Sequence, residues 1–333
     1  MTETMLATEG LTKRFEKRLD LAGRIAAKLG ANLREEVVRA VDGVDLSIAK
    51  GEVMGLVGES GCGKSTVGRM LAGIMPPSEG SIYWKGRNRA GLEGAERKAA
   101  NLAVQMVFQD PASSLNPRLR VEDIVGEAPR VHGLVSGAGL SAYVDETLTS
   151  VGLDPTVKRR YPHQFSGGQR QRIGIARALA VKPEFIVADE SVAALDVSIR
   201  AQIINLFADL RARFDLTYLF ISHDLSIVEH IADRVTVMYL GRIVESAPTE
   251  TLFRTPNHPY TRSLLAAVPR IEDRHRTFHA VAGEIPSPLN PPPGCHFHPR
   301  CPHAFARCSV ERPALREIAP GQRSACHLND ASV

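Results

Sequence analysis

A chain of 333 residues is long enough to bury a large core and to form more than one domain. Its 44% hydrophobic and 23% charged residues are typical of a globular protein, with no apolar run of the roughly 18–20 residues that cross a bilayer and no secretory signal. This composition excludes a membrane-spanning or secreted chain, so we expect a cytoplasmic protein whose five cysteines form no extracellular disulfide framework.

The net charge of +4 is concentrated near the N-terminus. Residues 11–39 carry eight Lys/Arg against four Asp/Glu, which accounts for the whole excess. Such a segment favours anionic lipid, nucleic acid or an acidic partner, although a solvated polar face explains it equally well. After a short strand near residues 11–15, we predict an inserted amphipathic helix over 16–38. Its apolar positions recur every four residues: Leu21, Ile25, Leu29 and Leu33.

Further along the chain, short apolar runs alternate with helical patterns. Continuous apolar runs indicate strands buried on both faces of a parallel sheet, so we predict an α/β core. The expected strands cover residues 37–48, 52–57, 184–188 and 217–222, with a hairpin over 235–245 that turns at Leu240-Gly241. The expected helices run from Lys64 to about Ile74 and along the crossover positions Ile199, Ile203, Leu206 and Leu210.

A glycine-rich loop joins the strand at 52–57 to the helix that begins at Lys64. It matches G-x-x-x-x-G-K-[ST], a pattern in which glycines turn backbone N–H groups toward phosphates and the helix N-terminus adds a favourable dipole. We assign Lys64 to the β- and γ-phosphates and Ser65 to Mg²⁺. The predicted nucleotide-binding residues of this loop are Gly58, Glu59, Ser60, Gly61, Cys62, Gly63, Lys64, Ser65 and Thr66.

The strand at 184–188 ends in two carboxylates. A phosphate-loop enzyme needs an acidic group here to hold the Mg²⁺ shell, which suits Asp189, and a base for the attacking water, which suits Glu190. Alone, this pattern is often only a strand that meets a solvated turn. The phosphate loop upstream favours the catalytic interpretation.

A second anion-binding turn opens another helix. Ser166, Gly167, Gly168 and Gln169 precede a helical pattern, and a helix N-terminus attracts anions. A chain with one phosphate loop has no obvious use for a second anion-binding helix N-terminus. We therefore predict a head-to-tail dimer in which this turn covers the nucleotide of the other subunit.

With these motifs in order, the sequence resembles the ABC transporter ATPases over almost its whole length. The resemblance implies a P-loop fold with a RecA-like core, an antiparallel β subdomain and a helical subdomain at about 110–168, all within residues 1–254. It implies that Gln109 contacts Mg²⁺ and senses the transporter, that Asp196 belongs to the D-loop, that His223 contacts the γ-phosphate and that Phe15 stacks on adenine. A purely structural role is the alternative for His223 and Phe15.

Within that family the chain looks most similar to the oligopeptide/dipeptide permease ATPases. The residues that carry this likeness are 108–111 (FQDP), 114–118 (SLNPR), 161–164 (YPHQ) and 258–261 (HPYT). The insertion at 16–38 resembles the longer N-terminal segment of one of the two ATPases in such systems. The sequence departs from the family at Phe165, Ser191 and Ala193, which leaves the D-loop geometry open.

Residues 255–333 differ in composition and form a predicted C-terminal domain. They hold 12 of the 21 prolines and four of the five cysteines, spaced C-x5-C-x6-C-x17-C at Cys295, Cys301, Cys308 and Cys326. Four thiolates suit Zn²⁺ or an iron–sulfur cluster, and the spacing does not choose between them or exclude free cysteines. The resemblance favours a [4Fe-4S] cluster.

The resemblance implies an ATPase that powers import of peptides or related small solutes. Its expected partners are a second ABC ATPase, two transmembrane permease subunits and an extracytoplasmic solute-binding protein, and its expected place is the cytoplasmic face of the inner membrane, peripherally bound. Its expected cofactors are ATP and Mg²⁺. A soluble ABC-type ATPase acting on nucleic acid or ribosomes is the alternative, but such proteins carry two cassettes or a long coiled-coil insertion. A regulatory or redox module would not need the set Gln109, Glu190 and His223.

Overall fold

The computed structural model describes residues 3–17, 36–193, 195–267 and 283–330. The strands are β1 (Thr4–Lys17), β2 (Glu36–Ala49), β3 (Val53–Val57), β4 (Glu79–Trp84), β5 (Arg87–Asn88), β6 (Val104–Val107), β7 (Phe185–Asp189), β8 (Thr217–Ile221), β9 (Arg234–Tyr239), β10 (Arg242–Pro248), β11 (Arg316–Ala319) and β12 (Gln322–Ser324). The α-helices are α2 (Lys64–Leu71), α3 (Gly94–Ala103), α4 (Pro111–Ser114), α5 (Val121–Val131), α6 (Leu140–Ser150), α7 (Gly167–Leu179), α8 (Val197–Phe214), α9 (Leu225–Ile231), α10 (Thr249–Arg254) and α11 (Pro259–Ala266).

An eight-stranded sheet in the order β11-β12-β10-β9-β3-β8-β7-β6 forms the centre of the molecule. Strands β6, β7, β8, β3 and β9 pair in parallel, and every residue of β3, β7 and β8 is buried. Apolar runs without alternation therefore form strands covered on both faces, as the sequence predicted. The predicted α/β fold class is confirmed.

Successive residues of these strands supply two separate cores. Phe185 and Val187 pack with helix α2 and strands β1 and β2, whereas Ile186 and Ala188 pack with α7, α8 and α9. Strand side chains alternate between the two faces of a sheet. Helix α2 and helix α7 therefore lie on opposite faces of the large sheet.

A second, antiparallel sheet has the order β2-β1-β4-β5. Strand β1 runs to Lys17 and β2 begins at Glu36, and these two residues pair. The prediction of an inserted helix over 16–38 is therefore wrong at both ends, because cross-strand pairing continues there and overrides the helical pattern. Leu21, Ile25, Leu29 and Leu33 lie outside the described residues.

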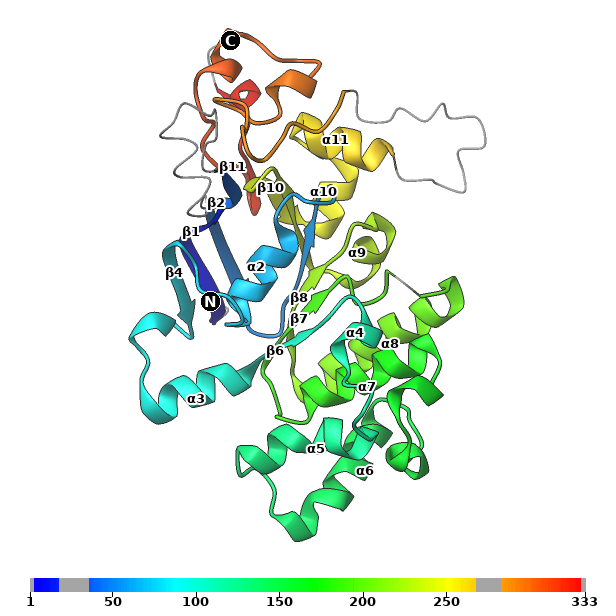
Figure 1. Ribbon diagram of the computed structural model, residues 1–333. Helices are drawn as coiled ribbons and strands as arrows, with labels where there is room; N and C mark the ends of the chain where they lie inside the picture. Colours follow the sequence, from blue (N-terminus) through cyan, green and yellow to red (C-terminus); the bar gives the residue numbers. More distant parts are fainter. Residues whose placement is uncertain (1–2, 18–35, 194, 268–282, 331–333) are drawn as a thin grey trace, which may run out of the picture.

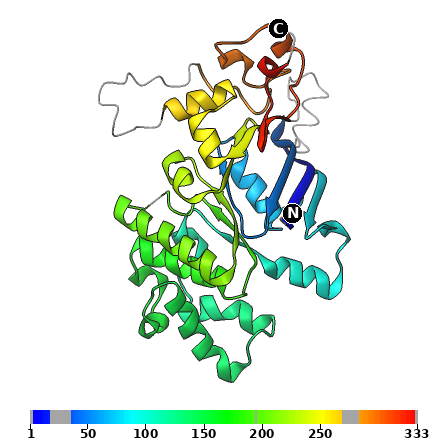
Figure 2. The ribbon, with the colours of Figure 1, turned by 180° about the vertical axis from the view of Figure 1, so that it is seen from behind.

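Helices α5, α6 and α7 gather at the end of the molecule opposite the C-terminal region (Figure 1), and the view from behind agrees (Figure 2). Within the part of the chain that is described, no helix is both long and apolar enough to cross a bilayer.

The C-terminal region joins the large sheet. Strand β12 pairs with β10 through Glu245↔Ser324 and Ser246↔Arg323, and β11 adds to β12. The division predicted at residues 254 and 255 falls between α10 and α11, yet the sheet continues across it. The tail and the nucleotide-binding core thus share one set of backbone hydrogen bonds.

Candidate functional site

The glycine-rich loop connects the C-terminal end of β3 to the first turn of α2. Gly63 precedes α2 with φ of 108°, a conformation open to glycine, and a Cβ there would overlap the carbonyl oxygen of Ala40. The backbone of β2 therefore lies directly against the loop. The strand–loop–helix context that the motif requires is present.

Lys64 is buried inside the loop that precedes it. Its Nζ donates to the carbonyl oxygens of Gly58 at 2.8 Å and Glu59 at 3.0 Å, and the residue is 4% exposed. The ammonium group is thus fixed on the concave side of the loop, where it can contact a bound phosphate. The Cys62 thiol beside it is buried, and burial raises its pKa. A neutral, buried thiol is no nucleophile.

Two of the three residues predicted to contact Mg²⁺ touch each other. The Ser65 hydroxyl donates to Asp189 Oδ1 at 2.8 Å, across the gap between α2 and the end of β7. Burial is the largest influence on Asp189 and raises its pKa. Hard divalent cations prefer oxygen ligands such as a carboxylate beside a hydroxyl, so Ser65 and Asp189 are suitable ligands for Mg²⁺.

Three side chains meet at the carboxyl ends of neighbouring parallel strands. Gln109 Nε2 donates to Glu190 Oε2 at 2.7 Å, and His223 Nδ1 lies 3.3 Å from Glu190 Oε1. These residues follow β6, β7 and β8, whose ends form one edge of the sheet, where open α/β folds bind ligands. The sequence placed them about 80 and 30 residues apart without contact, and the fold brings them together.

Glu190 is held in a backbone conformation that carries strain. Its φ is 44°, in the left-handed region that side chains other than glycine rarely adopt, and its N–H donates to the Ile221 carbonyl at 2.9 Å. Such a conformation costs on the order of 1–3 kcal/mol and persists where the surroundings impose it, most often at functional sites.

The turn at residues 166–169 begins α7 with a capping box. Gln169 N–H donates to Ser166 Oγ at 3.3 Å, and Ser166 N–H donates to Gln169 Oε1 at 3.1 Å. Ser166, Gly167 and Gln169 are exposed, while a Cβ on Gly168 would overlap the side chain of Ile199. Because α7 and α2 lie on opposite faces of the sheet, this exposed turn points to solvent and not into the loop of its own chain.

Phe15 and Asp196 lie at exposed positions. The Phe15 ring is 40% exposed, with Lys13 Nζ at 5.6 Å from its centroid, and Phe15 pairs with Val38 two residues before Ala40. Asp196 precedes α8. Ala194, near Asp196 in the predicted D-loop, lies outside the described residues. Ser191 is 1% exposed, and among the residues that the structure describes its hydroxyl has no hydrogen-bond partner.

The four tail cysteines are the predicted ligands of a metal ion or cluster. In the described residues, however, no three Cys, His, Asp or Glu side chains are arranged to hold a metal ion. Burial, with the other cysteines as a smaller cause, raises the pKa of Cys295 to about 11. Nearby histidines are used elsewhere, since His296 Nδ1 lies 3.0 Å from the Leu240 carbonyl oxygen and His327 lies 3.0 Å from that of Glu311.

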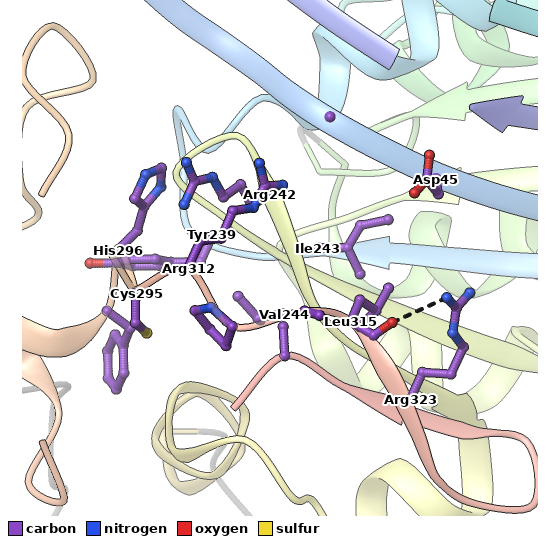
Figure 3. Close-up of a pocket in the computed structure, with 15 residues that line it drawn as sticks. Asp45, Tyr239, Arg242, Ile243, Val244, Cys295, His296, Arg312, Leu315 and Arg323 are labelled. Carbon is purple, nitrogen blue, oxygen red and sulfur yellow. Dashed lines mark hydrogen bonds between the residues drawn. The ribbon is translucent and has the colours of Figure 1, made fainter. Parts of the chain in front are cut away.

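A pocket of about 380 Å³ marks the joint between the tail and the core (Figure 3). Arg242, Arg312 and Arg323 line it, and each has an acceptor: Arg242 Nε donates to Asp42 at 2.7 Å, Arg312 to the Asp42 carbonyl at 3.1 Å and Arg323 to the Leu315 carbonyl at 3.3 Å. The joint is therefore held by the ion pair of Arg242 with Asp42 and by arginine hydrogen bonds to backbone carbonyls.

Two residues that no sequence motif predicted contact the phosphate loop. Arg300 pairs with the Glu59 carboxylate, and the Tyr260 hydroxyl accepts from the Glu59 N–H. Tyr260 stands in the HPYT segment that had been used only to recognise the family. A pattern in sequence gives no distance between residues about 200 positions apart.

Comparison with known proteins gives consistent matches. The ABC transporter family model matches residues 41–193, and the model for the C-terminal region of oligopeptide/dipeptide transporters matches residues 244–308. The oligopeptide transport ATP-binding protein AppF of Bacillus subtilis (strain 168) is 49% identical over 330 residues, which cover 98% of each chain. The protein named "Putative oligopeptide transport ATP-binding protein YkfD" from the same strain is 52% identical over 300 residues, 89% of this chain and 91% of that protein.

Solved structures agree on the fold. A bacterial ABC transporter cassette solved as a dimer is 28% identical, with a TM-score of 0.61 over 74% of this chain and 99% of that one. A dimeric cassette in a post-hydrolysis state with ADP and phosphate is 27% identical, with the same TM-score and coverage.

Proposed function

This chain belongs to the ATP-binding subunits of oligopeptide and dipeptide ABC transporters, which hydrolyse ATP, and from that premise we propose how its residues divide the work of ATP-driven peptide import. The observation that carries the proposal is the meeting of Gln109, Glu190 and His223 at one sheet edge, beside the Ser65–Asp189 pair.

Residues 58–66 bind the phosphates of ATP, with Lys64 on the β- and γ-phosphates. Ser65, Asp189 and Gln109 hold Mg²⁺, which when bound offsets the negative charge on the phosphates. Glu190 accepts a proton from the attacking water, and His223 donates to the γ-phosphate. These assignments are supported by the 2.8 Å contact of Ser65 with Asp189 and by the strained backbone at Glu190.

The Glu190 carboxylate accepts a hydrogen bond from Gln109 and also lies 3.3 Å from His223. Each oxygen keeps a further lone pair for a water, so these contacts orient the base, and closure of the site around ATP rearranges them. Gln109 then carries the change to the membrane subunits. A ligand shifts a conformational equilibrium only through contacts that differ between the states, and the triphosphate makes such contacts with Lys64 and His223 in the closed state.

The exposed turn at 166–169, together with Asp196, completes the ATP site of a second ATPase. The partners we propose are that second ATPase, two permease subunits and an extracytoplasmic solute-binding protein, with this chain bound peripherally at the cytoplasmic face of the membrane and no nucleic acid as ligand. In proteoliposomes with the binding protein and labelled peptide outside, peptide should accumulate in the lumen only when ATP is enclosed there, on the side that this subunit faces. ATP turnover without peptide uptake would contradict the transport role.

Phe15 stacks on adenine. We expect Phe15→Ala to raise the KM for ATP by roughly tenfold, since stacking of a base on an aromatic ring contributes about 1–3 kcal/mol. Phe214→Ala is a matched control, because Phe214 is also 40% exposed but ends α8. If the KM for ATP rises equally in both variants, or in neither, Phe15 has a structural role and does not stack on adenine.

The four tail cysteines form the proposed site of a [4Fe-4S] cluster, with Zn²⁺ as the alternative. Four partly buried thiols within one region of the tail support it, and Cys295 N–H donates to the Cys308 carbonyl at 2.9 Å. No step of ATP hydrolysis involves this group.

Replacing one of these cysteines tests that assignment. Cys301→Ser should remove iron or zinc from the purified protein and lower its thermal midpoint, while ATP turnover per assembled complex stays close to wild type. Cys62→Ser, which alters the one cysteine outside the tail, should keep the metal. Equal metal content and an equal midpoint in wild type and Cys301→Ser would rule out the tail site.

A further inference from the structure

One shielded ion pair connects the tail to the phosphate loop. Arg300 Nη1 and Nη2 donate to Glu59 Oε2 and Oε1 at 2.8 and 3.0 Å, a bidentate geometry that is stronger and more directional than a single contact. The Arg300 side chain is 4% exposed and that of Glu59 is 20% exposed. Because both groups are largely removed from water, salt screens the pair less than it screens a surface pair.

The backbone of Glu59 is fixed by the same region. Its N–H donates to the Tyr260 hydroxyl at 2.9 Å. The Tyr260 ring packs on Tyr239 and Phe297, with centroids 4.6 and 5.3 Å apart, and the Arg300 guanidinium lies 5.8 and 6.0 Å from those two rings. An aromatic cluster (Tyr239, Tyr260 and Phe297) thus anchors both groups that hold Glu59.

The position of Glu59 gives this contact a consequence for nucleotide binding. Glu59 directly follows Gly58, and the carbonyl oxygens of these two residues hold Lys64 Nζ. A free carboxylate in a loop that receives a triphosphate would repel it, whereas a carboxylate neutralised by a guanidinium does not. Movement of Glu59 would also change the carbonyl that positions the lysine.

We propose that Arg300 and Tyr260 are positioning residues through which the C-terminal region sets the ATP affinity of the phosphate loop, by neutralising and fixing Glu59. The inference rests on the proposed assignment of residues 58–66 to the nucleotide. Arg300 is adjacent to Cys301, and Phe297 lies two residues after Cys295, so a change in the packing of the tail reaches the loop through the same contacts.

Arg300→Met tests the proposal in the assembled transporter. Methionine keeps the length and apolar contacts of the side chain but removes the charge. We expect the KM for ATP and the dissociation constant of a fluorescent ATP analogue to rise together by about 5- to 20-fold, within the usual range for coupled sites, with kcat changed less than about twofold. Tyr260→Phe, which removes only the hydroxyl, should raise KM by a smaller factor.

Arg307→Met is the matched control. Arg307 lies in the same tail and also makes a bidentate pair, to Glu311 at 2.7 and 2.8 Å, with a further contact to Asp330. This variant should leave the KM for ATP unchanged, even if it lowers the thermal midpoint.

The double variant Glu59→Gln/Arg300→Met separates electrostatics from folding. With both charges removed, KM should return to within about threefold of wild type, since no unpaired carboxylate remains beside the triphosphate. A double variant with the same high KM as Arg300→Met would assign Arg300 a merely structural role. If Arg300→Met does not assemble, Arg300→Gln, which removes the charge but keeps a hydrogen-bond donor, takes its place, and an unchanged KM there overturns the proposal.

The same measurements separate the role of Arg300 from the assignment of residues 58–66 to the nucleotide. A wild-type complex that turns over ATP, with an unchanged KM in Arg300→Met, overturns only the role of Arg300. Normal nucleotide binding after loss of Lys64 would instead remove the phosphate-loop assignment.

Discussion

Replacing Glu190 by glutamine should slow ATP hydrolysis by the assembled transporter by roughly 10²–10⁴-fold, the usual contribution of general acid–base catalysis. Glutamine has nearly the same shape and can still accept from Gln109 Nε2, which lies 2.7 Å from the carboxylate. It cannot accept a proton from water. Nucleotide binding should persist, because Lys64, Ser65 and Asp189 are untouched.

Turnover and binding must be measured on the same preparation. Glu184→Gln is a suitable control, because Glu184 lies just before the opposite end of β7 and pairs with Lys85 at the surface. It should turn over ATP normally. If Glu190→Gln also turned over at the wild-type rate, Glu190 would not be the base, and the strain at its backbone would need another explanation.

The Ser166→Asp variant should lower kcat of the complex by about 10²-fold while ATP still binds to the phosphate loop of this chain. Aspartate is as good a helix N-cap as serine, so α7 keeps its start. The aspartate carboxylate, however, repels the triphosphate of the partner site. The substitution also removes the serine hydroxyl, and loss of one preorganised donor alone costs about 10²–10³-fold in kcat.

The matched change Ser136→Asp puts the same charge on another exposed serine in the helical part of the chain, before residues 137–139. It should have little effect on turnover. Wild-type kcat in Ser166→Asp would show that the turn at 166–169 does not face phosphate during the cycle.

The large elements and the phosphate loop could be predicted from local pattern. A buried run such as 185–188 allows few alternatives to a central strand, and the G-x-x-x-x-G-K-[ST] spacing dictates the strand before it and the helix after it. These features depend on neighbours in sequence. The residues needed to recognise them are contiguous.

Features that depend on distant partners were not predicted. The helical spacing of residues 16–38 gave no indication that Lys17 would pair with Glu36, because cross-strand bonding competes with helix propensity only once both strands exist. Likewise, four cysteines in one tail did not imply a formed metal site among the described residues. The Arg300–Glu59 pair spans 241 positions, and an arginine among prolines and cysteines carries no local sign of its partner.

The central claim is that each ATP is held between the phosphate loop of one ATPase and the Ser166–Gln169 turn of the other. Within this chain, Lys64 and Ser166 then serve different ATP molecules. The most direct test counts molecules of a non-hydrolysable ATP analogue occluded per complex. We predict about two for wild type, about one for Lys64→Met or Ser166→Asp alone, and close to none for the double variant; a double variant that traps as much as either single variant would mean that both residues act on the same nucleotide, and would contradict the claim.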